Sequence, residues 1–142
     1  MANLLDRKNL LKKEAFAIEK VDFGEEGFVF VRQMSARERD RFEQSLILET
    51  KDSKGTITGY TKSLEDFRAK LAVVTICDET GNNLLNPEDY VMLSTNMTAS
   101  KMEKIVNVAQ KLNKITEEDK EALVKNSDAA PDGSFNSGSA EN

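Results

Sequence analysis

The chain has 142 residues, of which 39% are hydrophobic and 32% charged, a composition typical of one soluble, helix-leaning domain. No apolar run approaches the roughly 20 residues of a bilayer-spanning helix, and no signal-peptide pattern is present, so we expect neither membrane insertion nor secretion. The formal net charge of −5 argues against nucleic-acid binding, which normally needs a basic surface.

Residues 1–14 carry four leucines among charged residues. The simplest interpretation is a short amphipathic helix or a frayed N-terminal arm. The alternative is an arm that docks on a neighbouring subunit or on another partner.

Residues 15–33 predict an antiparallel β-hairpin. Apolar and polar residues alternate around Ile18, the turn is bounded by Gly24 and Gly27, and the β-forming run 28–31 follows. This second strand is apolar on both faces, so it is either covered on both sides or forms an interaction edge. We therefore expect a partner or self-association surface that comprises Leu4, Leu5, Leu10, Leu11, Phe28, Val29, Phe30 and Val31.

Ser35 and Glu38 form a capping-box pattern that predicts a helix over about 35–50. The polar segment 51–62 contains two glycines and is expected to be a surface loop, with a small hairpin through 56–58 as an alternative.

Residues 63–78 predict the central core helix. Leu64, Phe67 and Leu71 recur at helical spacing, and the second half of the segment is apolar nearly all round. Ser63 is the expected cap, with Asp66 at the capping-box position. The single cysteine, Cys77, lies in this apolar stripe and is expected to be a small buried hydrophobe, which fits a cytoplasmic address.

Three further helices are predicted at about 87–94, 98–112 and 117–125. The first begins with Asn86 and Pro87, and the last is capped by Thr116 with Asp119 at the box position. Residues 127–142 are small, polar and acidic and are expected to be disordered. The expected fold is α+β and mostly helical: one domain over 15–126, with an N-terminal antiparallel β-hairpin followed by a bundle of four to five helices.

The residues that catalysis usually requires are missing. The chain has no histidine, no phosphate-binding glycine loop and no G-x-S-x-G motif. The neighbouring carboxylates at 78–79 and 88–89 lie at predicted helix ends, where capping explains them. We therefore expect a binding protein rather than an enzyme, with no metal and no cofactor.

Four passages in order resemble the phage tail assembly chaperone family. Residues 31–42, VRQMSARERDRF, are similar to the family's V-R-x-L-S-A-x-E-R-x-x-F. FRAKL at 67–71 and DETGNNLL at 78–85 resemble its R-A-x-L helix and D-E-x-G-x-x-L-F turn, and AQKLNKITEED at 109–119 resembles A-x-x-L-N-G-L-T-x-x-D. The resemblance spans about residues 16–126. Lys114 replaces the usual glycine and Leu85 the usual aromatic residue, and both departures concern local packing.

The resemblance implies a protein of long-tailed, siphovirus-type bacteriophages that works in the host cytoplasm and is absent from the mature virion. Such chaperones coat the long helical tape measure protein and promote polymerisation of the tail tube. The implied partners are the tape measure protein, further copies of this chain in a homo-oligomer, and the tail-tube protein through a longer form made by ribosomal frameshifting. Two alternatives remain: a structural tail or head–tail completion protein retained in the virion, and a host-directed or regulatory small acidic protein.

Overall fold

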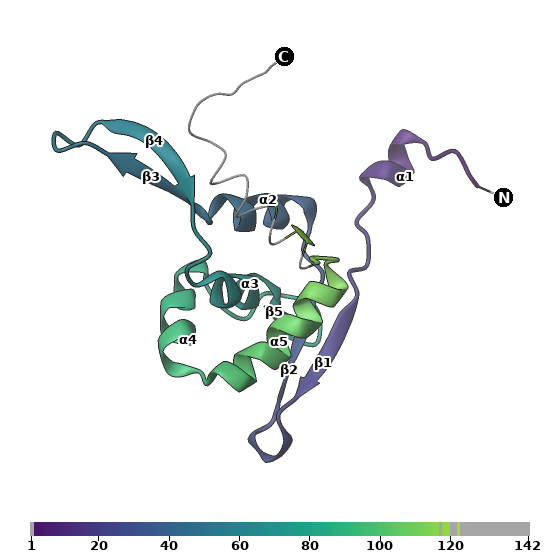
Figure 1. The fold of residues 1–142 in the computed structure, drawn as a ribbon. Coiled ribbons are helices and arrows are strands. Elements are labelled where there is room, and N and C mark those ends of the chain that lie inside the picture. Colours follow the sequence, from purple (N-terminus) through teal and green to yellow (C-terminus); the bar gives the residue numbers. More distant parts are fainter. Residues whose placement is uncertain (1, 117, 120–121, 123–142) are drawn as a thin grey trace.

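The computed structural model describes residues 2–116, 118–119 and 122, which fold into helices and two small antiparallel sheets (Figure 1). The expected mostly helical α+β fold with an N-terminal hairpin is confirmed. The elements in chain order are α1 (Arg7–Leu11), β1 (Ile18–Asp22), β2 (Phe28–Arg32), α2 (Ala36–Gln44), β3 (Ile47–Lys51), β4 (Ile57–Lys62), α3 (Phe67–Thr75), β5 (Ile76–Cys77), α4 (Tyr90–Asn96) and α5 (Ala99–Leu112), with short 3-10 turns at Gly24–Glu26 and Pro87–Asp89.

The first sheet has the strand order β1-β2-β5 and is antiparallel throughout. Ile18 lies opposite Arg32 and Asp22 opposite Phe28, so the predicted hairpin is present. Its turn depends on Gly27, whose φ of 115° is a conformation that residues with a Cβ rarely adopt.

The third strand of this sheet corrects two predictions. Residues 76–77 were expected to continue the core helix, but the helix ends at Thr75 and Ile76 takes extended geometry. Ile76 pairs with Val31, which makes β2 the central strand of the sheet and excludes the interaction-edge alternative for it. Cys77 is buried as expected, but in a strand rather than in a helix.

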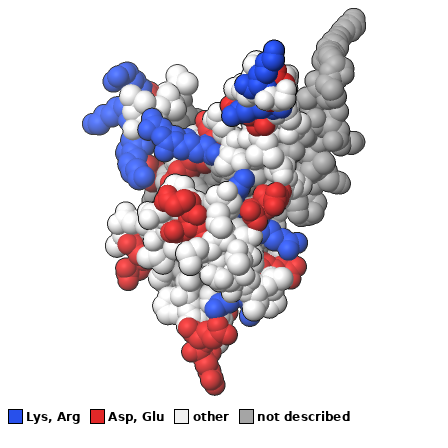
Figure 2. All heavy atoms as spheres, turned by 90° about the vertical axis from the view of Figure 1, so that its left-hand side faces the viewer, with Lys and Arg blue, Asp and Glu red and all other residues white. Residues whose placement is uncertain are grey.

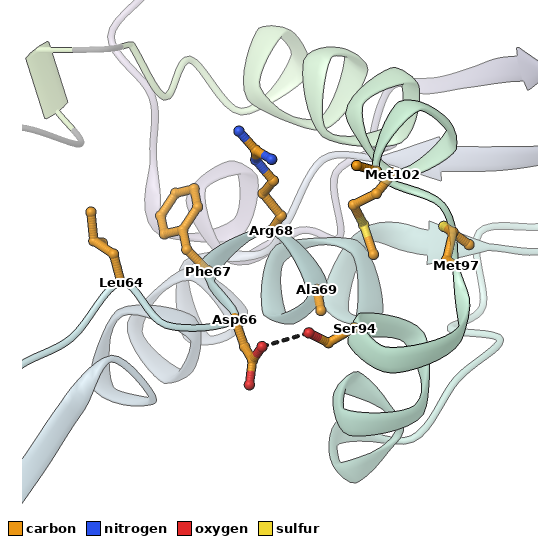
Figure 3. Close-up of a pocket in the computed structure, with 9 residues that line it drawn as sticks. Leu64, Asp66, Phe67, Arg68, Ala69, Ser94, Met97 and Met102 are labelled. Atoms are coloured by element: carbon orange, nitrogen blue, oxygen red, sulfur yellow. Dashed lines mark hydrogen bonds between the residues drawn. The ribbon is translucent and has the colours of Figure 1, made fainter.

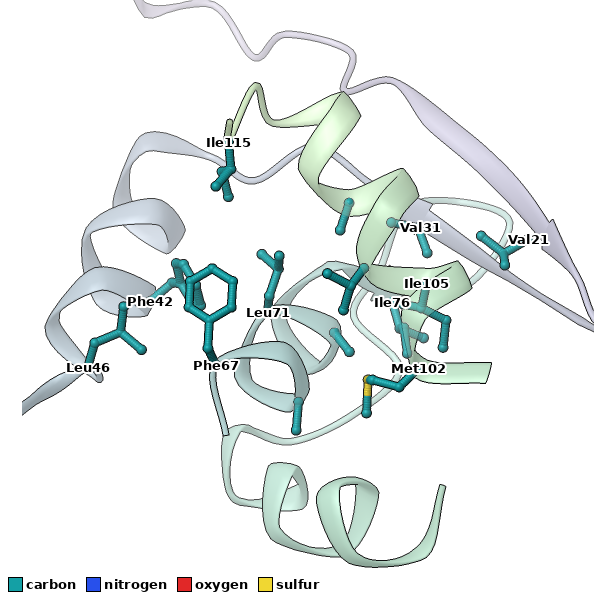
Figure 4. Close-up of a cluster of buried hydrophobic side chains, with 14 residues drawn as sticks. Val21, Val31, Phe42, Leu46, Phe67, Leu71, Ile76, Met102, Ile105 and Ile115 are labelled. Carbon is teal, nitrogen blue, oxygen red and sulfur yellow. The ribbon is translucent and has the colours of Figure 1, made fainter. Parts of the chain in front are cut away.

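Helix α3 is the centre of the fold, as predicted. It contacts α2, α4, α5 and β2, and Leu71 is completely buried within the core shown in Figure 4. The ring of Phe67 packs edge-on against Phe42 of α2, with 5.4 Å between the ring centroids. Helix α5 was predicted over 98–112 and is present, with Ile105 fully buried against α3.

Most helices begin at the capping residues that the sequence predicted. The Ser35–Glu38 capping box is present, and the backbone N–H of Asn86 donates to the carboxylate of Asp89. The Ser63–Asp66 capping box is wrong: Asp66 has a φ of 59°, and the Ser63 hydroxyl accepts from the backbone of Glu65. A left-handed residue directly before α3 makes the chain turn sharply, so the spacing needed for the box is lost.

The second sheet also departs from the predictions. Helix α2 ends at Gln44, whereas the expected helix reached about residue 50, and β3 begins at Ile47. Strands β3 and β4 pair as a hairpin that includes most of the expected loop over 51–62 and is longer than the alternative hairpin through 56–58. Figure 1 shows this hairpin extending away from the helices.

The last predicted elements lie mostly outside the described residues. Thr116 and Asp119 exchange the two hydrogen bonds expected of a capping box, at 2.9 and 3.0 Å. Residues 118, 119 and 122 of the predicted helix over 117–125 are helical, whereas its other residues and the predicted disordered tail over 127–142 fall outside the part of the chain that the structure describes.

Candidate interaction surfaces

The four leucines of the N-terminal arm all lie on the surface. Helix α1 is capped by Asp6, which accepts a hydrogen bond from the backbone of Asn9 at 2.9 Å, and none of its residues is buried. Figure 1 shows α1 standing apart from the rest of the fold. Five residues are too few for an independently stable helix, so contact with a further apolar surface would stabilise it. The exposed side chains are Leu4, Leu5, Leu10 and Leu11.

The strand residues 28–31 are divided between two faces. Val31 is completely buried, and Val29 is partly buried and packs against the core, so both side chains lie on the core face of the strand. Phe28 and Phe30 lie on the opposite face, with Phe28 exposed and Phe30 half-buried. The strand is apolar on both faces because one covers the core and the other forms an aromatic patch.

The aromatic patch consists of Phe28, Phe30 and the side chain of Lys20. The two rings meet edge to face with centroids 5.4 Å apart. The Lys20 ammonium lies 4.3 Å from the centroid of Phe28, within the range of a cation–π interaction. The Lys20 ammonium therefore covers one face of the Phe28 ring, while about half of the Phe28 side chain remains exposed to a partner.

Beside this patch lies a buried polar cluster that the sequence did not reveal. Arg32 is only 5% exposed and donates to both carboxylate oxygens of Glu38, at 2.9 and 2.7 Å. The same guanidinium donates to Asn83 at 2.6 Å. The cluster ties β2, α2 and the turn after β5 together. Glu38 was indicated by the capping-box pattern, whereas the only signal in the sequence for Arg32 and Asn83 was their place in passages that resemble the chaperone family.

In this cluster Glu38 is ionised and Arg32 is protonated at neutral pH. Burial would raise the pKa of Glu38, but hydrogen bonds from Arg32 and from the backbone of Ser35 outweigh it and lower the pKa to about 2. The hydrogen bond to Glu38 also raises the pKa of Arg32. A carboxylate held ionised with both oxygens engaged is suited to holding structure together rather than to proton transfer.

A hollow of about 460 Å³ lies between α3, α4 and the start of α5 (Figure 3). Its walls combine apolar side chains, among them Phe67 and Met102, with the polar pair in which Asp66 accepts a hydrogen bond from Ser94. A second hollow of about 450 Å³ lies between α2, α3 and residues 83–90, where Phe42 and Tyr90 contribute. Both hollows can receive apolar side chains, and among the described residues no group of three cysteine, aspartate and glutamate side chains is placed to hold a metal.

Charge on the surface is mixed in sign. Figure 2 shows basic side chains gathered on the upper part of one face, whereas its lower tip, where Figure 1 places the turn between β1 and β2, is acidic. Glu26 in that turn pairs with Lys101 of α5, whose hydrogen bond lowers the pKa of Glu26. Within the described residues, no helix is both long and apolar enough to cross a bilayer.

Comparison with protein-family models, with curated proteins and with solved structures gives no match for this chain.

Proposed function

We propose that this chain is a phage tail assembly chaperone, a binding protein that keeps the tape measure protein soluble and promotes tail-tube polymerisation in the host cytoplasm without remaining in the virion. The observation that carries this proposal is the exposed N-terminal arm, with its four leucines standing apart from the folded body. The order of the four passages that resemble the family supports the same function.

The arm has the chemistry needed to shield a long amphipathic helix. Burying one leucine side chain contributes about 1.5–3 kcal/mol before the ordering entropy of the arm is subtracted, so one copy binds weakly. Many copies along a rod-shaped partner bind reversibly as a set, because each neighbour raises the effective concentration of the next. The arm carries four basic residues and two acidic ones, which also favours acidic stretches of the partner.

The buried polar cluster supports the proposal in a second way. Arg32 and Glu38 belong to the passage at 31–42, and Asn83 to the passage at 78–85. Their direct contact joins the two passages in the fold of this chain.

The test is co-expression of this chain with the tape measure protein of the same phage, followed by pull-down and light scattering. We expect a soluble complex with many copies per tape measure protein. A variant with serine at Leu4, Leu5, Leu10 and Leu11 should stay folded and leave the tape measure protein insoluble. The matched control places serine at Leu84, Val91 and Met92 on the body, which are about as exposed as Leu5, Leu10 and Leu11, and it should behave as wild type. If both variants lose solubility of the tape measure protein equally, or if neither loses it, the assignment of the arm as the binding surface is contradicted.

Mass spectrometry of purified phage particles separates the chaperone from the alternative of a tail or head–tail completion protein. A chaperone is absent from the particles, whereas a completion protein is present in defined copy number. The gene sequence tests the longer form: a slippery heptamer before the stop codon is expected if the tail-tube protein is recruited by a frameshifted extension.

A further inference from the structure

A third hollow, of about 580 Å³, lies at the base of the N-terminal arm, between the segment that follows α1, the start of α2 and the end of α5. Figure 1 shows the segment between α1 and β1 passing beside the end of α5. Four basic side chains line this basic hollow: Lys12, Lys13, Arg39 and Lys114. One carboxylate, that of Glu14, lines it as well. Positive charge is thus concentrated at one place on a chain whose formal net charge is −5.

Three of the four cations of the basic hollow have no anionic partner. Arg39 donates to the carboxylate of Glu43 at 3.0 Å and to the backbone carbonyl of Asn113 at 3.1 Å, so its charge is already compensated. Within the part of the chain that the structure describes, none of the three lysines of the hollow forms an ion pair with a carboxylate. Because neighbouring like charges repel one another, an anionic partner would stabilise this arrangement.

Lys114 occupies a backbone position that favours glycine. After α5, the backbone N–H of Ile115 donates to the carbonyl of Gln110 at 2.9 Å. The N–H of Lys114 donates to the carbonyl of Lys111 at 3.3 Å, and the two bonds together form the Schellman motif of a helix end. The left-handed residue of this motif is usually glycine, because a Cβ is strained there, yet Lys114 has a φ of 54°.

The helix dipole alone does not account for this strained lysine. Lys111 already places a basic group in the last turn of α5, where a cation is favoured by the dipole. The side chain of Lys114 lines the basic hollow. A residue held in a strained conformation points to a function of its side chain, which here is the positive charge that it brings to the hollow.

The basic hollow also has an apolar part. Phe16, Met34 and Leu112 line it, and all three side chains are partly buried. Met34 and Leu112 pack against the core, which fixes their positions. A fitting ligand therefore combines carboxylates with an apolar group. Nucleic acid fits less well, because the net charge of −5 repels a polyanion at long range.

We propose that the basic hollow binds an acidic segment of a protein partner, whose carboxylates meet Lys12, Lys13 and Lys114 while an apolar side chain packs beside them. Exposed ion pairs are individually weak, so recognition requires the three lysines together. This inference goes beyond the proposed function and does not depend on it, because the charge and the strain that carry it are properties of this chain alone.

The test measures binding of a short fluorescent peptide, in which one leucine lies between two runs of glutamate, by fluorescence anisotropy at fixed ionic strength. The wild type should bind this peptide about tenfold more tightly than a peptide with glutamine in place of glutamate, because the lysines attract the carboxylates. Lys114→Gly should weaken binding about threefold, yet be at least as stable in urea, because the strain at φ is relieved. Lys114→Arg keeps the charge and should bind as wild type. Lys12→Gln together with Lys13→Gln should weaken binding about tenfold.

The matched control combines Lys54→Gln with Lys104→Gln, which makes the same change in net charge at exposed lysines outside the basic hollow and should bind as wild type. Three results overturn the proposal: a wild type that does not distinguish the two peptides, a Lys114→Gly variant that binds as wild type, or equal weakening in the control. A DNA oligonucleotide of equal charge that binds as tightly as the glutamate peptide also overturns it, in favour of a phosphate-binding surface. A chain that fails to bind the peptide but still solubilises the tape measure protein would leave the chaperone function standing and remove only this site.

Discussion

Glu38→Gln should destabilise the fold strongly at neutral pH and weakly in acid. The substitution removes the negative charge that compensates Arg32, whose guanidinium is only 5% exposed. The pKa of Glu38 falls from an ordinary 4.5 to about 2 on folding, which corresponds to about 3 kcal/mol of stability because each pKa unit is worth ~1.36 kcal/mol. We therefore expect Glu38→Gln to lower the free energy of unfolding by about 3 kcal/mol at pH 7.

The sign of the pH dependence follows from the depressed pKa. A carboxyl group with a folded-state pKa below its unfolded-state value stabilises the fold in full above the unfolded value, and this stabilisation is lost as the pH falls through the folded value. The difference between wild type and Glu38→Gln should hence shrink between about pH 4.5 and pH 2.

The assay is urea unfolding followed by far-UV circular dichroism at several pH values. Glu43→Gln is the matched control: Glu43 lies on the same helix and pairs with Arg39 at 3.0 Å, but this pair is partly exposed and should contribute about 0.5 kcal/mol. Equal destabilisation by the two substitutions, or a Glu38→Gln effect that does not change between pH 7 and acid, would refute the reasoning.

Three further outcomes are expected. Leu71→Ala, at a completely buried position of α3, should lower the free energy of unfolding by about 2–5 kcal/mol in chemical denaturation, whereas Leu84→Ala at an exposed position should stay within about 0.5 kcal/mol of wild type. Gly81→Ala should destabilise by about 1–2 kcal/mol, because the backbone φ of 92° strains any residue with a Cβ; an unchanged denaturation midpoint would contradict this. Burial raises the pKa of the Cys77 thiol, so alkylation should be far slower in the native chain than in urea, and equal rates would show that the strand is open.

Local chemistry was sufficient for the features that depend on neighbouring residues in the chain. The hairpin of β1 and β2, the Ser35–Glu38 capping box and the helix over 98–112 follow from alternation, capping residues and a 3.6-residue period. The exposed leucines of the arm were also predictable, because a short charged segment has too little apolar surface to form a core.

The candidate surface was only half predictable. A strand that is apolar at every position cannot reveal which alternate side chains face the core, and the pairing with β1 and β5 placed Val29 and Val31 inside and Phe28 and Phe30 outside. The Arg32 cluster could not be derived from spacing, since its members come from residues 32, 38 and 83.

The sequence alone determined the fold class, the first hairpin, most helix starts and the exposed arm, because these depend on contacts within a few residues. Only the tertiary structure decided that Ile76 and Cys77 form a strand and that the chain leaves α2 after Gln44. Short apolar runs are compatible with either helix or strand, and the free strand edge of β2 selects the strand for residues 76–77. At Ile47 the selecting contact is the ladder with β4, formed by residues ten or more positions further along the chain.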